Sequence, residues 1–92
     1  MNDNNHISEN IKKIISLKFT NSSINVTNYD ANVSIVIISQ LFEKKSLIER
    51  HTMVYNILKH MIDSKEIHSL SLKTYTMNEY MKKSNGKIIN KW

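Results

Sequence analysis

Four consecutive apolar residues, Ile35 to Ile38, form the longest unbroken hydrophobic run in this chain of 92 residues. The run is far too short to cross a lipid bilayer, and it leaves no polar face. Such a run is typical of a central β-strand that is covered on both sides. A chain of this length buries only about 60–65% of its unfolded surface, so its core is thin. We therefore predict one small domain built on a sheet, with this run in the central strand.

The first half of the chain carries one helical pattern and two strand patterns. Apolar residues at three- and four-residue spacing predict a helix that is capped by Ser8 and continues to Phe19. Alternating residues from Ile24 predict a half-buried strand, and a second strand follows over residues 33–41. Residues 28–32 are rich in side chains that tolerate turn geometry, so the two strands are expected to form a hairpin.

The second half continues with a helix, a strand and a helix. After a polar connection at 42–45, Ser46-Leu47-Ile48-Glu49 matches a capping box and predicts a helix that ends near Ile62. Residues 67–75 alternate again, and Thr76-Met77-Asn78-Glu79 is a second capping box that opens a short last helix. The order helix-strand-strand-helix-strand-helix predicts an α+β fold in which helices pack against a three-stranded sheet.

The positive charge of the chain is concentrated at its carboxyl end. The net charge is +5, but four lysines and no acidic residue lie between Tyr80 and Trp92. Residues 1–79 carry nine basic and eight acidic side chains, a net charge of +1. We therefore divide the chain into a disordered amino terminus at 1–6, a domain at 7–83 and a basic tail at 84–92. Lys, Ile and Asn share A/T-rich codons, so mutational drift also accounts for much of this composition.

Few catalytic arrangements are compatible with this composition. The chain has no cysteine, which excludes a thiol nucleophile and any cluster held by its own thiolates. Gly86 is the only glycine, so phosphate-binding loops and nucleophile elbows are absent. The four histidines, at positions 6, 51, 60 and 68, include no pair at three- or four-residue spacing that would clamp a metal on one helical turn. We therefore expect a protein that is not an enzyme and that holds no complete metal site alone.

Several spaced motifs of the second half resemble the BolA-like family. The family pattern is a Phe-Glu-Gly-Lys connection, an Arg-His pair one turn into a helix, an apolar-His pair at the start of a strand, and a Lys-Thr-x-Thr-Pro-Glu-x-Trp stretch. The corresponding segments here are Phe42-Glu43-Lys44-Lys45, Arg50-His51, Ile67-His68 and Lys73-Thr74-Tyr75-Thr76. The chain departs from the pattern at four positions, where other residues replace glycine, proline, glutamate and tryptophan: Lys44, Met77, Asn78 and Tyr80.

The resemblance implies a class II KH-like fold and a partnership with a monothiol glutaredoxin. In such complexes a [2Fe-2S] cluster is shared between the glutaredoxin, glutathione and the BolA-like chain, and the isolated chain binds no cofactor. The family's histidine ligand matches His68. The second family ligand is a Cys or His in the loop that corresponds to residues 28–32, which contain neither and offer only Asp30 as a weak substitute. Arg50 and Tyr80 are the expected partner-binding residues.

Each candidate residue also has a structural interpretation. His68 either ligates the shared cluster, as imidazole does in Rieske centres, or covers the sheet edge and bonds to a backbone group. His51 lies within the apolar stripe of the second helix, which favours a neutral, hydrogen-bonded core histidine over a ligand, whereas His60 should face water. Arg50 should be more exposed than His51, and it either contacts glutathione or a partner carboxylate or is a solvated surface charge.

The sequence leaves three alternative functions to consider. The first is a non-enzymatic partner of a monothiol glutaredoxin in iron–sulfur cluster assembly, trafficking or iron regulation. The second is a nucleic-acid-binding transcriptional regulator that uses the KH-like fold, although the chain lacks a Gly-x-x-Gly loop and its tail lysines would bind weakly and without sequence preference. The third is a protein-interaction domain without metal. We expect a monomer in the absence of the partner, no membrane association, and location in the cytoplasm, with the nucleus reached by diffusion.

Overall fold

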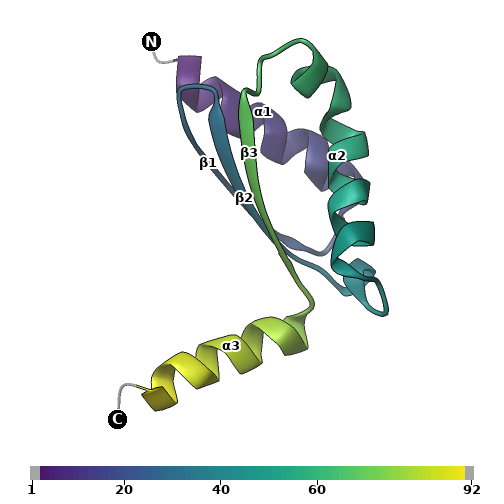
Figure 1. Cartoon of the computed structure of the whole chain (residues 1–92), viewed down its shortest axis with the longest axis vertical. Helices are drawn as coiled ribbons and strands as arrows, with labels where there is room; N and C mark the ends of the chain where they lie inside the picture. The colour runs from purple at the N-terminus through teal and green to yellow at the C-terminus, as the bar shows by residue number, and fades with distance from the viewer. Residues whose placement is uncertain (1–2, 91–92) are drawn as a thin grey trace.

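The computed structural model describes residues 3–90, together with the side chains of residues 6–83. The helices and strands follow one another in the predicted order (Figure 1). They are α1 (Asp3–Lys18), β1 (Ser23–Tyr29), β2 (Asn32–Ile38), the short 3-10 helix η1 (Gln40–Phe42), α2 (Leu47–Asp63), β3 (Ser69–Tyr75) and α3 (Met77–Asn90). The α+β class predicted from the sequence is therefore confirmed. None of the helices in this described part of the chain is long and apolar enough to span a membrane.

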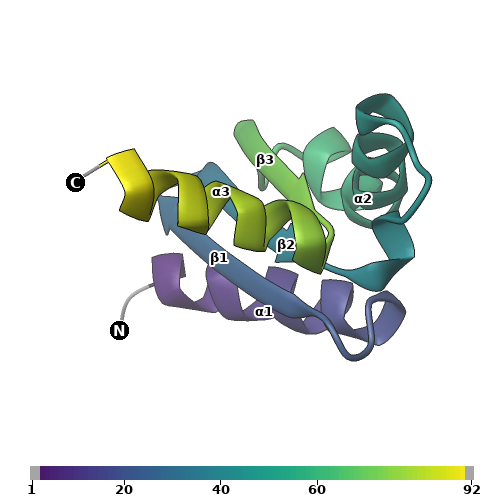
Figure 2. The ribbon, with the colours of Figure 1, turned by 90° about the horizontal axis from the view of Figure 1, so that it is seen from below.

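The sheet has the order β1-β2-β3, with the apolar run in the central strand as predicted. β1 and β2 are an antiparallel hairpin, and β3 lies parallel to β2 because α2 crosses over between them. α1 and α2 pack on one face of this sheet (Figure 2). The core between the sheet and these helices is formed mainly by residues of α1, β2 and α2 and by Phe19, which follows α1; its members are Ile11, Ile15, Phe19, Val33, Ile35, Ile37, Val54 and Leu58.

The other face of the sheet is largely open, which corrects the prediction that the apolar run is covered on both sides. Ile35 and Ile37 are buried against the helices, whereas Val36 and Ile38 point to the opposite face and are half-buried. α3 leaves the end of β3 and extends away from α2, so only its first turns lie near this face (Figure 1). Because no helix of the described part packs along its whole length, the second face stays accessible. We refer to it below as the open face.

The boundaries of the first helix differ from the sequence prediction. α1 begins at Asp3, so residues 3–6 are helical where a disordered segment was predicted, and residues 1 and 2 lie outside the described part. Ser8 is therefore inside the helix and not its cap. Its hydroxyl donates a hydrogen bond to the side chain of Asn28 on β1, which ties the helix to the hairpin.

Two strand boundaries also differ from the sequence prediction. β2 ends at Ile38 because Ser39 is the N-cap of η1, where its hydroxyl accepts the N–H of Leu41 (3.1 Å). The backbone N–H of Ser39 still donates to the carbonyl of Tyr75 (2.9 Å). β3 begins at Ser69 because Ile67 is still bonded to the end of α2, through its N–H to the carbonyl of Met61 (3.1 Å). Because of these contacts, β2 ends before the predicted residue 41 and β3 begins after the predicted residue 67.

Both predicted capping boxes are confirmed. The hydroxyl of Ser46 accepts the N–H of Glu49 (3.1 Å), and the Glu49 carboxylate accepts the N–H of Ser46 (2.7 Å). At the start of α3, the same exchange joins Thr76 and Glu79 at 3.2 and 2.9 Å. α3 then runs to Asn90, beyond residue 83 where we ended the domain, so most of the predicted tail has a helical backbone; residues 91 and 92 lie outside the described part.

The connection at 42–45 is not wholly polar, because Phe42 is fully buried. Its ring packs against Phe19, with centroids 5.2 Å apart.

We predict that Phe42→Ala lowers the free energy of unfolding by about 3–5 kcal/mol, through lost burial and the cavity that remains. The matched control is Leu41→Ala, since Leu41 is 45% exposed and should cost much less. Urea unfolding followed by circular dichroism measures both, and equal losses would contradict the central place of Phe42 in the core.

Candidate functional site

His68 lies immediately before β3 and is exposed to solvent. Its backbone N–H donates to the carbonyl of Ala31 in the hairpin turn, at 2.8 Å, and the N–H of Ser69 shares this acceptor at 3.4 Å. The imidazole itself forms no hydrogen bond with the residues whose side chains the structure describes. The backbone is thus held against the hairpin while both ring nitrogens remain available.

The hairpin turn beside His68 is short. β1 ends at Tyr29 and β2 begins at Asn32, so only two residues, Asp30 and Ala31, connect the strands. Asp30 has a φ of 52°, a left-handed conformation that Asp tolerates better than most residues. The parallel register pairs Asn32 with Ser69, and the Ser69 hydroxyl donates to the Asn32 side chain at 2.7 Å. The structure therefore brings together the two segments from which the resemblance expects ligands.

This end of the sheet offers one nitrogen ligand and no complete metal site. Among the described residues, no group of three or more His, Cys, Asp and Glu side chains could hold a metal ion. Lys65, which has a φ of 68°, lines a shallow depression with His68, Ile62 and Ile67. Any cluster bound here needs further ligands from outside this chain, because a [2Fe-2S] centre takes four.

Arg50 is buried, which corrects the expectation that it is more exposed than His51. Its guanidinium forms a bidentate ion pair with Glu79 of α3, at 2.7 and 3.0 Å. It also donates to the carbonyls of Lys45 (3.0 Å) and, through a longer bond, Thr74 (3.4 Å), and it stands over the ring of Phe42 at 5.6 Å from the centroid. Four hydrogen bonds thus join its guanidinium to other parts of the chain.

The ion pair shifts the pKa of both partners. The guanidinium of Arg50, followed by the backbone N–H of Thr76, lowers the pKa of Glu79 from its ordinary value of 4.5 to about 2. In return, the hydrogen bond to Glu79 raises the pKa of Arg50. Both side chains are therefore charged at neutral pH.

The sequence did not predict this contact because helical spacing was expected to bury His51 and to leave its neighbour Arg50 more exposed. The structure reverses this order, because Arg50 keeps only 8% of its surface exposed whereas His51 is half-buried. The only sequence signal was indirect: Glu79 closes a capping box at the start of α3, which places a carboxylate at the end of β3. Nothing in the sequence pairs that carboxylate with an arginine 29 positions earlier.

The other histidines are placed mostly as predicted. His51 is half-buried, and its Nε2 atom is buried without a hydrogen-bond partner among the described residues, so the expected hydrogen bond is not present. His60 faces solvent, as the helical spacing predicts. Neither lies in the segment that holds His68.

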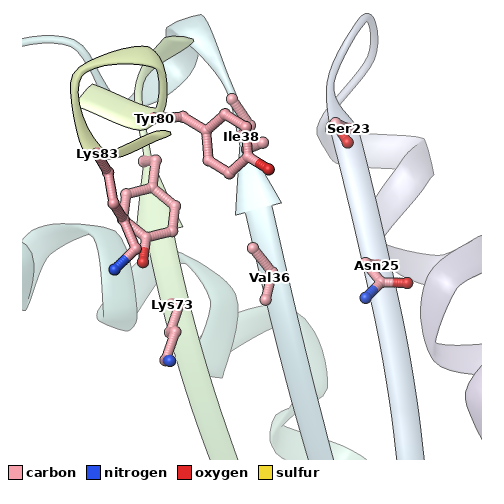
Figure 3. A pocket seen from close by; sticks show the side chains of 8 residues that line it. Ser23, Asn25, Val36, Ile38, Lys73, Tyr80 and Lys83 are labelled. Atoms are coloured by element: carbon pink, nitrogen blue, oxygen red, sulfur yellow. The ribbon is translucent and has the colours of Figure 1, made fainter. Parts of the chain in front are cut away.

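Tyr80 lies far from His68. It is 39% exposed and contacts Tyr75 edge-on, with ring centroids 5.9 Å apart and an interplanar angle of 63°. β3 has seven residues between these two ends, which separates them by about 20 Å. Tyr80 lines a depression on the open face (Figure 3). We call it the sheet-end depression, and it is lined by Ser23, Asn25, Val36, Ile38, Lys73, Tyr75, Tyr80 and Lys83.

Because of this ion pair, we expect part of the free energy of unfolding to depend on pH. Because folding lowers the pKa of Glu79 to about 2, its contribution is complete above the unfolded value of 4.5 and is lost as the pH falls through 4.5 toward 2. We expect Glu79→Gln to lose about 1 kcal/mol at neutral pH, a value reduced by the partial exposure of Glu79, and to unfold with a flatter pH dependence below 4.5.

Urea unfolding at several pH values between 2 and 7 measures this difference. Glu9→Gln on the exposed surface of α1 is the control and should follow the wild type. Parallel pH profiles for the wild type and Glu79→Gln would show that the pair contributes nothing.

Comparison with known proteins gives the family. Residues 13–79 match the family described as BolA-like protein. An uncharacterized protein of Buchnera aphidicola is 42% identical over 59 residues, which are 64% of this chain and 56% of that relative. The chain therefore spans little more than half the length of this relative.

Solved structures agree with the assignment. A bolA protein homologue from Coxiella burnetii is 33% identical, with a TM-score of 0.69 over 80% of this chain and 95% of that one. The BolA domain of SufE1 from Arabidopsis thaliana has a TM-score of 0.72 at 22% identity, covers 79% of this chain and 94% of that domain, and shows the fold alone. The family match and the shared fold together show that this chain belongs to the BolA-like family.

Proposed function

We propose that this chain is a non-enzymatic partner of a monothiol glutaredoxin and contributes one ligand, His68, to a [2Fe-2S] cluster shared with the glutaredoxin and glutathione. The observation that carries the proposal is the exposed imidazole of His68 on a backbone held by the Ala31 carbonyl at 2.8 Å. Membership of the BolA-like family supports it, because the resemblance implies this partnership and places the family's histidine ligand at His68.

The environment of His68 supports a ligand role over a purely structural one. A structural histidine would use its ring to bond a backbone group, whereas here the backbone N–H makes that bond. A neutral imidazole is a suitable ligand for one iron of such a cluster, as in Rieske centres. The exposed position allows a partner to approach the ring directly.

The short hairpin turn supplies no Cys or His ligand, so His68 is the one ligand that this chain contributes in the proposal. Two residues connect β1 and β2, and neither is Cys or His. The remaining ligands would therefore come from the glutaredoxin cysteine, glutathione and other groups outside this chain. A site that depends on several molecules is suited to cluster transfer or sensing more than to storage.

Arg50 and Tyr80, the two expected partner-binding residues, differ in how accessible they are to a partner. Arg50 is committed to Glu79 and two carbonyls, so its part in binding a partner would be to hold the start of α3 in place. Tyr80 is accessible but lies about 20 Å from His68, at the other end of β3. A partner that reached both His68 and Tyr80 would have to span the length of the sheet.

Anaerobic reconstitution with a monothiol glutaredoxin, glutathione and iron tests the proposal. We expect the wild type to change the visible absorption and circular dichroism of the glutaredoxin-bound cluster, because an imidazole replaces a sulfur ligand. His68→Ala should restore the spectrum of the glutaredoxin alone. His60→Ala is the matched control, since His60 is also exposed but lies on α2, and it should behave as the wild type.

Two results would overturn the proposal. One is a glutaredoxin spectrum that the wild type leaves unchanged under reducing conditions. The other is an altered spectrum that His68→Ala retains in full, which would assign the ligand to another residue.

A further inference from the structure

The segment that carries His68 enters the sheet from a turn with a constrained backbone. α2 ends at Asp63, and Lys65 follows in the left-handed region, with a φ of 68°. Side chains with a Cβ atom disfavour this conformation, so surrounding contacts must hold it. One such contact is the N–H of Ile67, which donates to the carbonyl of Met61 at 3.1 Å. The direction in which the chain leaves this turn decides where His68 lies.

Two backbone bonds join this segment to the hairpin turn, and they share one acceptor. The N–H groups of His68 and Ser69 both donate to the carbonyl of Ala31, at 2.8 and 3.4 Å. The second distance is long for an N–H···O bond, so this acceptor holds Ser69 less firmly than His68. The backbone bonds to the turn therefore depend on a single oxygen atom.

A side-chain bond completes the attachment. The Ser69 hydroxyl donates to the Oδ1 atom of Asn32 at 2.7 Å, across the parallel pairing of β2 with β3. Asn32 is the first residue of β2 and Ser69 is the first residue of β3, so the bond joins the two strands where both begin. Among the side chains that the structure describes, no other pair forms a hydrogen bond between these two strands.

This bond leaves the imidazole of His68 accessible. His68 lines a depression of about 360 Å³ together with Ile62 of α2, on the side of the sheet where the helices pack. Ser69 and Asn32 belong to the rows of residues on β3 and β2 that point to the open face. The two side chains can therefore fix the backbone of His68 without covering its ring.

We propose that Asn32 and Ser69 are positioning residues for His68, an inference that rests on the ligand role proposed above. Their side-chain bond holds the backbone of His68 at the hairpin turn, so that the imidazole is in place before a partner brings the cluster. The physical reason is preorganisation. A ligand that is already fixed loses less conformational entropy on binding than one that must be ordered at that moment.

Amide hydrogen exchange of the chain alone, followed by NMR, tests whether the bond holds this segment. We expect Ser69→Ala to lower the protection factors of the amides of residues 68 and 69 about fivefold, as the loss of one net hydrogen bond implies. Ser69→Thr keeps the hydroxyl and should restore the wild-type values. Ser71→Ala is the matched control, since Ser71 is also exposed on β3 but its hydroxyl forms no hydrogen bond with a described residue.

The acceptor gives a second variant that removes the same bond. Asn32→Ala should lower the protection factors as much as Ser69→Ala does. Combining the two substitutions should add little, because residues that share one interaction are not additive. Additive effects would mean that the two side chains act separately, which would contradict the inference.

Titration of a cluster-loaded monothiol glutaredoxin with the chain tests the positioning role, with visible circular dichroism as the readout. Ser69→Ala keeps the imidazole, so we expect the same final spectrum as with the wild type. The midpoint should move to a higher concentration, by up to about fivefold, because a smaller fraction of the chain has His68 in place. Ser69→Thr should restore the midpoint. In the His68→Ala background, Ser69→Ala should change nothing further.

The outcomes separate this inference from the proposed function. Unchanged protection factors in Ser69→Ala would overturn the inference, because the bond would then not hold His68. Lower protection with an unchanged midpoint would also overturn it, since the bond would then be structural only. A wild-type chain that leaves the glutaredoxin spectrum unchanged would instead overturn the proposed function, and the positioning role with it, whatever the exchange rates show.

Discussion

The contact between Arg50 and Glu79 is the constraint on which much of this small domain depends. A buried guanidinium is costly unless its donors are satisfied, and here a carboxylate and two carbonyls accept from it while an aromatic ring lies beneath it. These partners belong to the connection before α2, the end of β3 and the first turn of α3. One side chain thus joins three segments of the chain. It also determines where Tyr80 lies.

The sheet separates two chemically different ends. At one end, the parallel pairing of β2 with β3 places His68 beside the hairpin turn, where an imidazole is exposed on a rigid backbone. At the other end, α3 brings an aromatic ring and a lysine to the open face. The seven residues of β3 separate these ends by about 20 Å. The covered face, in contrast, contributes only packing.

How far the sequence could predict the site depends on how local each contact is. Both capping boxes were predicted and confirmed, because each bond joins residues three positions apart. The exposure of His60 followed from helical spacing alone. The burial of Arg50 could not be predicted in the same way. Its partner lies 29 positions away, and a basic residue is assigned to the surface unless that partner is known.

The sequence by itself determined the order of helices and strands, the central place of the apolar run, the helix starts at both capping boxes and the absence of any thiolate ligand. Each of these follows from residue identity or from spacing within a few positions. Only the tertiary structure decided that one face of the sheet stays open, that His68 lies against the hairpin turn and that Arg50 is buried. These features depend on which distant segments meet and on how many helices remain to cover the sheet, and neither is encoded in local periodicity.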